Sequence, residues 1–169
     1  INSELIGDAE IEILVNSSWT RRWPLLSIAQ YLQTELDKLG IKASVNSLEM
    51  GAYNDAVKAG QYHITFTPWT GSDPDDFFRT WILSSGSFNV NRGIRYNNSE
   101  ADQLIARAAS EMDRDLRRSI YFELQKLAAL EAPISPIYHD LTVYAARSYV
   151  KDFRMDFNFR PDLTAVKFE

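Results

Sequence analysis

Short apolar segments alternate with longer amphipathic segments along the first 70 residues. Residues 10–16 combine alternating and continuous apolar positions, which is typical of a strand, and similar segments follow at 41–47 and 62–67. Between these segments, residues 25–39 carry apolar side chains at helical spacing, and residues 50–59 are predicted as a second, shorter helix. This order, with connections long enough for parallel pairing, predicts a parallel sheet with helical crossovers.

Glycine and proline mark the expected ends of these first helices. Pro24 precedes the first apolar stripe, and proline suits a helix start because its missing N–H group would have no partner there. Gly40 is expected to end that helix in a left-handed conformation, and Gly60 closes the second helix.

A further helix is predicted after the third strand. Asp73 is a typical N-cap, Pro74 suits the first helical position, and the following acidic residues favour the first turn. This helix is expected to run to Leu83. Residues 84–95 are polar and contain glycine, which predicts a loop of the kind that often carries function.

Two amphipathic helices are predicted next. Ser99 and Asp102 have the spacing of a capping box, and the second helix is expected to extend from Asp113 to Pro133. The expected apolar stripes comprise Ala101, Leu104, Ile105, Ala108 and Met112 in the first helix and Leu116, Ile120, Leu124 and Leu127 in the second. Residues 134–146 then have the composition of a strand.

The predicted elements indicate a single α/β domain over residues 1–169. We expect a mixed, mainly parallel sheet flanked by helices, followed by an irregular tail at 147–169 with a last strand at 164–168. A chain of this length can bury a core without disulfides or structural metals.

Composition excludes several classes of protein. The 18 basic and 23 acidic residues give a net charge of -5, and the basic residues form no cluster, which argues against nucleic acid as a partner. The absence of cysteine excludes disulfides, thiolate metal sites and cysteine nucleophiles. No apolar run approaches the ~20 residues of a membrane-spanning helix. The chain begins at Ile1 without an initiator Met, as a processed product or a piece of a longer chain would.

No sequence motif for catalysis or metal binding is evident. The chain contains neither a phosphate-binding glycine loop nor a G-x-S-x-G elbow, and its two histidines, His63 and His139, lie far apart. We expect both to be structural or surface residues. The acidic residues at 73, 75 and 76 could be metal ligands, but the helix start explains each of them and is the favoured interpretation.

Trp69 follows the strand predicted at 62–67. Ligands of open α/β sheets lie beyond the carboxyl ends of strands, so Trp69 could offer an exposed, flat surface to a ligand. The alternative is that its ring packs over the edge of the sheet as part of the core. Both interpretations remain open at this point.

Several segments carry a resemblance to a known family. These are IAQYLQTELDKLGIK at 28–42, WTG at 69–71 with DPD at 73–75, YNN at 96–98 with ADQLI at 101–105, PISPIY at 133–138 and VKDF at 150–153. Asp113, Arg117, Tyr121 and Gln125 also stand at the family's positions. Their order over nearly the whole chain resembles the C-terminal lobe of bacterial extracytoplasmic solute-binding proteins of the peptide/nickel class, which serve ABC transporters.

The resemblance implies a periplasmic-binding-protein-like lobe. Such proteins have two lobes joined by a hinge, and this chain would supply one of them, with the tail at 147–169 returning toward the other. The lobe would help to capture a small solute, such as an oligopeptide, outside the membrane and deliver it to an ABC transporter permease. It would be periplasmic or lipid-anchored, monomeric and without catalytic activity, cofactor or metal. The candidate ligand-binding residues are Trp69, Thr70, Gly71, Ser72, Tyr53, Asn91 and Arg95.

The sequence also departs from the family's pattern. Peptide-binding members usually carry an Asp shortly after the Trp-containing turn, which pairs with the peptide's α-amino group, whereas Ser72 stands there in this chain. Nickel-binding members can place a His in the loop that corresponds to 84–95, which here contains none. Arg92 and Arg95 in that loop could meet an anionic ligand or lie in solvent.

Two other functions remain as alternatives. The same fold could form the sensor domain of a regulator, in which case the parent chain should carry a DNA-binding domain. A hydrolase that uses carboxylates such as Asp73 and Glu49 is the other alternative, although the chain lacks nucleophile and base motifs.

Overall fold

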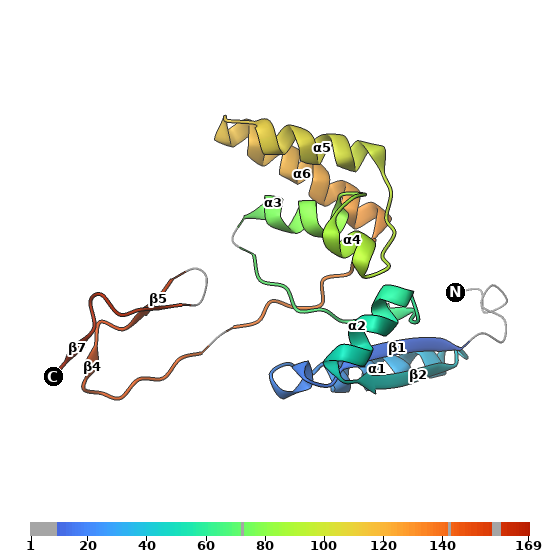
Figure 1. Ribbon diagram of the computed structural model, residues 1–169, viewed down its shortest axis with the longest axis horizontal. Coiled ribbons are helices and arrows are strands. Elements are labelled where there is room, and N and C mark those ends of the chain that lie inside the picture. Colours follow the sequence, from blue (N-terminus) through green and yellow to red (C-terminus); the bar gives the residue numbers. More distant parts are fainter. Residues whose placement is uncertain (1–9, 72, 142, 157–159) are drawn as a thin grey trace. The chain divides into compact units, whose positions relative to one another are not determined.

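The computed structural model describes residues 10–71, 73–141, 143–156 and 160–169 and divides into two compact units (Figure 1). The first, here called the sheet unit, comprises Ile1–Pro68 and Ser85–Arg95. The second, here called the helical unit, comprises Trp69–Ser84 and Tyr96–Glu169.

The sheet unit contains a three-stranded parallel sheet. The strands are β1 (Ile11–Asn16), β2 (Ala43–Leu48) and β3 (Ile64–Thr65), in the order β2-β1-β3. Their register places Ile13 opposite Val45 on one side and Ile64 on the other. The three predicted strands and their parallel pairing are therefore confirmed, although β3 is shorter than the sequence pattern suggested.

The central strand β1 is covered on both faces, which explains its run of apolar residues. Ile13 and Val15 pack on one face against Leu25 and Ala29 of α1 (Leu25–Lys38). On the other face, Leu14 packs against Tyr53 and Val57 of α2 (Met50–Ala59).

The two crossover helices lie where the sequence predicted them. Helix α1 begins one residue after Pro24, and Gly40 follows its end with a φ of +75°. Helix α2 has the predicted bounds, and Gly60 caps it with a φ of +71°. Leu39, which was expected in the apolar stripe of the first helix, is instead exposed because the chain already turns at this position.

The helical unit begins with an irregular helix. Asp73 accepts a hydrogen bond from the backbone N–H of Asp75 (2.8 Å) and so caps α3 (Pro74–Phe77), as predicted. A π-helical segment, η3 (Phe78–Ile82), continues it and buries Phe78, Trp81 and Ile82. The predicted helix is thus present, but it changes from α-helical to π-helical geometry at Phe78.

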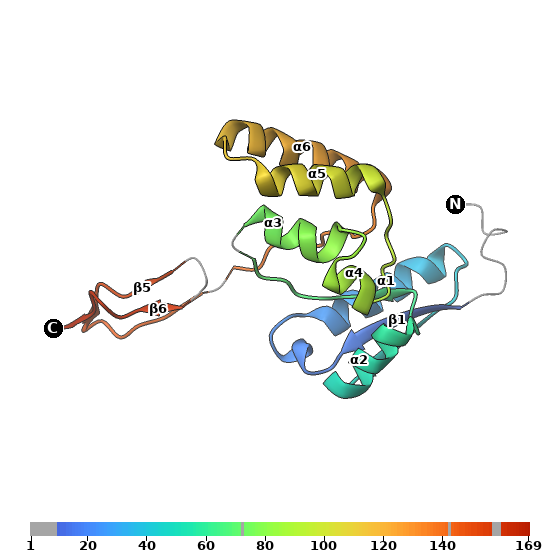
Figure 2. The ribbon, with the colours of Figure 1, turned by 45° about the horizontal axis from the view of Figure 1, so that its top comes forward.

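Two long helices, α5 (Ser99–Ser110) and α6 (Arg114–Glu131), pack side by side (Figures 1 and 2). Their contact buries Leu104 and Ile105 with Ile120 and Leu124, as their spacing predicted. Met112 and Leu116 were also expected in these stripes and are exposed, at 92% and 56%. Met112 lies in the turn between the helices, and Leu116 lies in the first turn of α6.

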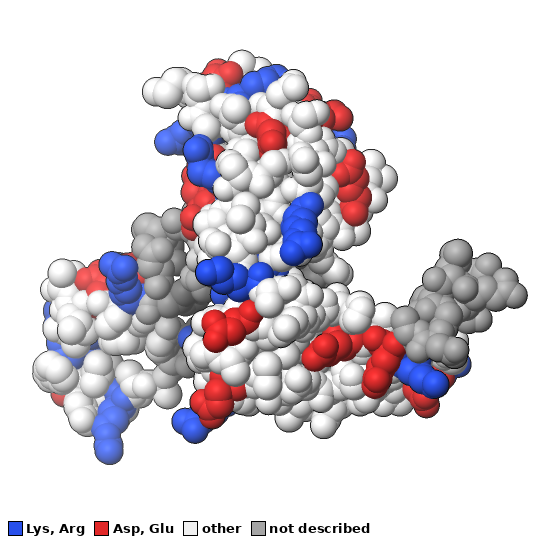
Figure 3. Space-filling view, turned by 45° about the vertical axis from the view of Figure 1, so that its right-hand side comes forward, with Lys and Arg blue, Asp and Glu red and all other residues white. Residues whose placement is uncertain are grey.

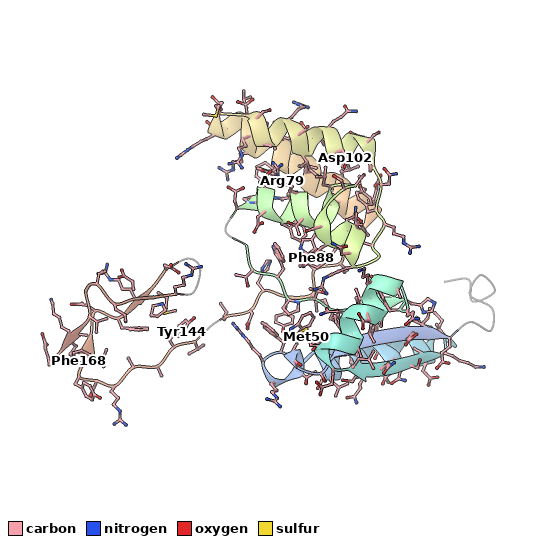
Figure 4. All side chains as sticks on the ribbon, in the orientation of Figure 1. Met50, Arg79, Phe88, Asp102, Tyr144 and Phe168 are labelled. Carbon is pink, nitrogen blue, oxygen red and sulfur yellow. The ribbon has the colours of Figure 1, made fainter. Side chains whose placement is uncertain are left out.

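The cap of α5 differs from the prediction. Asn98 is the N-cap and accepts hydrogen bonds from the backbone N–H groups of Glu100 (2.8 Å) and Ala101 (3.2 Å), while Ser99 is the first helical residue. Asp102, labelled in Figure 4, accepts a hydrogen bond from the backbone N–H of Ser84 (2.9 Å). This carboxylate therefore serves a tertiary contact and not a capping box.

Two further sequence predictions are wrong. The loop expected at 84–95 contains a short helix, α4 (Ser87–Asn91). No strand is present in the described part of 134–146, which leaves out Thr142, and most side chains of this extended segment are exposed. A backbone segment can form a strand only where a neighbouring strand accepts its hydrogen bonds.

The tail forms two antiparallel ribbons. In one, β4 (Val150–Lys151) pairs with β7 (Lys167–Phe168), which is a shorter form of the strand predicted at 164–168. In the other, β5 (Arg154–Met155) pairs with β6 (Pro161–Asp162). None of the helices among the described residues combines the length and apolar character needed to cross a lipid bilayer.

Candidate functional site

A cavity of about 300 Å³ lies in the helical unit at the start of α3. It is lined by Trp69, Gly71, Asp73, Pro74 and Phe77. Two of the predicted ligand-binding residues, Trp69 and Gly71, thus meet at one concave surface together with the first turn of a helix. The ring and backbone surfaces could contact a small ligand, because such sites combine aromatic walls with a few polar groups.

Trp69 is half-buried, which differs from the high exposure expected of it. Its ring meets that of Trp81 edge to face, with ring centroids 5.7 Å apart, and Trp81 in turn stacks on Phe77 at 6.3 Å. Edge-to-face pairs of this kind contribute about 0.5–1.5 kcal/mol beyond their buried area. Trp69 therefore packs against Trp81 of the same unit, and not over the edge of the sheet, and it also lines the cavity. Its contact with a ligand stays a prediction.

Gly71 allows a close approach of the turn to its neighbours. A Cβ atom at this position would lie 3.0 Å from Nε1 of Trp69 and 3.0 Å from a carboxylate oxygen of Asp76. A larger residue here would require the Trp69 ring or the Asp76 carboxylate to shift. Thr70 beside it is exposed, and the prediction for Ser72 falls outside the described residues.

Hydrogen bonds and ion pairs fix the base of the turn. Nη2 of Arg117 lies 3.0 Å from the capping oxygen of Asp73 and 3.2 Å from the hydroxyl of Tyr121. The Tyr121 hydroxyl donates to Asp75 (3.3 Å), which also pairs with Arg79 (3.0 Å). The hydrogen bond with Tyr121 raises the pKa of Arg117, and burial raises the pKa of Tyr121. Two acidic residues of this helix start, Asp73 and Asp75, therefore pair with arginines.

A second polar region lies in the sheet unit, where β1 ends. Asn16 is fully buried; its side-chain oxygen accepts a hydrogen bond from the backbone N–H of Ser18 (2.9 Å), and its amide lies 3.2 Å from the sulfur of Met50, labelled in Figure 4. Trp19 then meets Tyr53 edge to face at 5.3 Å. Buried polar groups at the carboxyl edge of a parallel sheet are in the position where ligands of α/β proteins lie.

The predicted site residues of the sheet unit have different environments. Tyr53 is 0% exposed, and its hydroxyl donates to the carbonyl of Phe66 (3.2 Å) and lies 3.0 Å from the hydroxyl of Thr65. Its observed contacts therefore position the chain beyond β3. Asn91 and Arg95 are exposed, and Arg95 has a φ of 55°.

His63 has a structural contact, and His139 is exposed. The imidazole Nδ1 of His63 accepts a hydrogen bond from the backbone N–H of Glu12 (2.9 Å), which confirms a structural role at the edge of the sheet. Among the residues that the structure describes, no three His, Asp or Glu side chains converge as metal ligands would. On the face that Figure 3 shows, basic and acidic side chains are interspersed.

Sequence analysis missed several residues of these two regions. Phe77 lines the cavity, and its position one helical turn after Asp73 was the available signal. For Asn16 the available signal was its position as the polar residue at the carboxyl end of an apolar strand. Trp19 gave none, because its contact with Tyr53 joins positions far apart in the chain.

Comparisons with known proteins identify the family. The model of bacterial extracellular solute-binding proteins, family 5 Middle, matches residues 4–90. A dipeptide-binding protein of Pseudomonas aeruginosa is 32% identical over 123 residues, which cover 72% of this chain and 23% of that protein. A di/tripeptide-binding protein 3 of the same species is 30% identical over 130 residues, covering 76% and 24% respectively.

A solved structure supports the same fold. The dipeptide-binding protein of a Pseudoalteromonas species, in complex with Met-Leu, has a TM-score of 0.74 and 19% identity over 98% of this chain and 34% of its own. The chain spans about a quarter of the length of the curated relatives it matches. The α/β fold with a parallel sheet flanked by helices is thus that of periplasmic binding proteins. On the family match and these relatives, this chain belongs to the bacterial extracellular solute-binding proteins of family 5.

Proposed function

We propose that this chain is a ligand-binding lobe of an ABC importer's solute-binding protein, and that the solute is a short peptide. The observation that carries the proposal is the family match together with relatives named for dipeptide and tripeptide binding. The protein would act outside the membrane as a monomer, deliver the peptide to a permease and release it unchanged.

The cavity at the start of α3 is the proposed contact surface of this lobe. Trp69 would offer its ring to the peptide, and the backbone at Thr70 and Gly71 would supply hydrogen-bonding groups. Arg117 and Tyr121 would hold this turn in place through Asp73 and Asp75. A rigid turn favours binding because less conformational freedom is lost when the ligand arrives.

Native mass spectrometry tests the proposal most directly. The two-lobed protein that contains this chain should be purified without denaturation and sprayed intact, and bound molecules should then be released and sequenced. A co-purified set of short peptides is the expected result. A haem, a metal chelate or a sugar in their place would refute the peptide class, and conversion of added peptides during incubation would refute the binding role.

A further inference from the structure

The chain carries sulfur only in methionine, because it has three methionines and no cysteine. Met112 lies in the turn between α5 and α6 and is 92% exposed, and Met155 belongs to β5. The side chains of these two make no hydrogen bond with any residue that the structure describes, whereas the sulfur of Met50 accepts one. Met50 is therefore the oxidisable sulfur whose chemical state affects a contact within the fold.

The Met50 sulfur is the acceptor for a buried amide. Nδ2 of Asn16 lies 3.2 Å from it, and Asn16 is fully buried at the end of β1. The other end of the amide is also bonded, because the side-chain oxygen of Asn16 accepts a hydrogen bond from the backbone N–H of Ser18 (2.9 Å). The sulfur is the one acceptor of the amide NH2 group among the described residues. Since burial keeps water away, loss of this acceptor leaves the donor unsatisfied.

Met50 is also accessible from solvent. It is the first residue of α2 and is 38% exposed (labelled in Figure 4). A thioether sulfur has two lone pairs, and the hydrogen bond with Asn16 uses one of them. Susceptibility of methionine to peroxides rises with its exposure, and the product is a polar sulfoxide. The Met50 side chain thus connects the solvent with a buried amide.

We propose that Met50 is a site of reversible oxidation, and that its sulfoxide releases the contact between the end of β1 and the start of α2. The oxidant is a peroxide. Hydrogen peroxide transfers one oxygen atom to the sulfur: its O–O bond breaks, an S–O bond forms with a sulfur lone pair, and water leaves. The sulfur is oxidised by two electrons, and the peroxide is reduced by two.

The sulfoxide cannot replace the thioether in this contact. Its sulfur carries a partial positive charge and is a poor acceptor, and an oxygen on the side that faces Asn16 would overlap the amide nitrogen 3.2 Å away. The Asn16 amide then turns toward another partner, and the N–H of Ser18 loses its acceptor. The edge-to-face contact of Trp19 with Tyr53 (5.3 Å) still joins the two segments, so the start of α2 loosens without unfolding. All these residues lie in the sheet unit, and the inference does not depend on which solute is bound.

The test treats the folded protein that contains this chain with hydrogen peroxide. Peptide mapping by mass spectrometry locates each sulfoxide, and amide hydrogen exchange with residue resolution reports on the contact. The reporter is the amide of Ser18, because Ser18 is exposed and its N–H is bonded to Asn16. Met50→Leu removes the sulfur and leaves Asn16 without its acceptor. The matched control is Met112→Leu, which removes a more exposed thioether that lacks such a contact.

In the wild type, Met50 should be oxidised more slowly than Met112, and the Ser18 amide should then exchange about tenfold faster. Met112→Leu should show the same change. Met50→Leu should exchange fast before treatment and should not respond to peroxide.

A methionine sulfoxide reductase should restore slow exchange in the oxidised wild type. The inference is overturned if Met50 stays reduced while Met112 is fully oxidised, or if its sulfoxide leaves the Ser18 exchange rate unchanged. A response of Met50→Leu to peroxide equal to that of the wild type would also overturn it, because another residue would then be the cause. Fast exchange that persists after the sulfoxide is reduced would refute reversibility.

Discussion

The cap at Asp73 gives the sharpest test of how the turn beside the cavity is built. One carboxylate oxygen of Asp73 accepts hydrogen bonds from the Asp75 backbone N–H (2.8 Å) and from Arg117 (3.0 Å). Replacement by alanine removes both interactions, whereas replacement by asparagine keeps an acceptor for the backbone and loses the charge. The two variants therefore separate capping from ion pairing.

The expected magnitudes follow from these contacts. Loss of an N-cap costs about 0.5–2 kcal/mol. The ion pair adds less than ~1 kcal/mol, because the Asp73 and Arg117 side chains are 47% and 34% exposed and water screens their attraction. We expect Asp73→Ala to reduce the free energy of unfolding by about 1–2 kcal/mol, which lowers the Tm of a ~100-residue unit by about 5–10 °C. Asp73→Asn should lose less than half of this.

Thermal unfolding followed by circular dichroism measures the global effect, and amide hydrogen exchange at Asp75 reports on the cap itself. In the wild type this amide should exchange slowly, and in Asp73→Ala it should exchange faster while the amides of α6 keep their rates. If Asp73→Ala leaves both the Tm and the Asp75 exchange rate unchanged, the cap does not stabilise the turn. If asparagine is as harmful as alanine, the charge and not the cap is the stabilising feature.

Three further outcomes are expected. Trp69→Ala should leave the fold largely intact, with a loss of about 1 kcal/mol from its edge contact with Trp81, and should weaken peptide binding by the two-lobed protein; calorimetry would contradict this if the variant unfolded or bound normally. Hydrogen bonds from Tyr96 and Asn98 lower the pKa of Glu131, so their stabilisation should be present above pH ~4.5 and be lost as the pH falls through the lower pKa of the folded state. Glu131→Gln should therefore lower the Tm at pH 7 and have little effect near pH 3, and a pH-independent difference would contradict it. The 169-residue chain alone should bind short peptides weakly or not at all, because binding sites bury ~70–90% of a ligand; equal affinity of this chain and the two-lobed protein in calorimetry would refute the one-lobe proposal.

Features that depend on neighbouring residues were predictable from the sequence. Asp73 and Asp113 cap their helices through backbone N–H groups two or three residues away, and Gly60 ends a helix by adopting a positive φ. The apolar run of β1 predicted a buried strand, and the strand is buried because α1 and α2 cover its two faces. The caps depend on contacts within a few residues along the chain. The burial of β1 is indicated directly by its consecutive apolar residues.

Features that depend on distant residues were decided only by the tertiary structure. Asp102 has the spacing of a capping box but bonds to the N–H of Ser84, and residues 134–141 have the composition of a strand but no neighbouring strand. The candidate site follows the same division. The turn at Trp69 was visible as a local pattern, whereas the edge-to-face contact of Trp19 with Tyr53 joins residues more than 30 positions apart. Contacts of this kind depend on how the sheet unit packs around β1, because that packing determines which side chains meet, and no local pattern in the sequence records it.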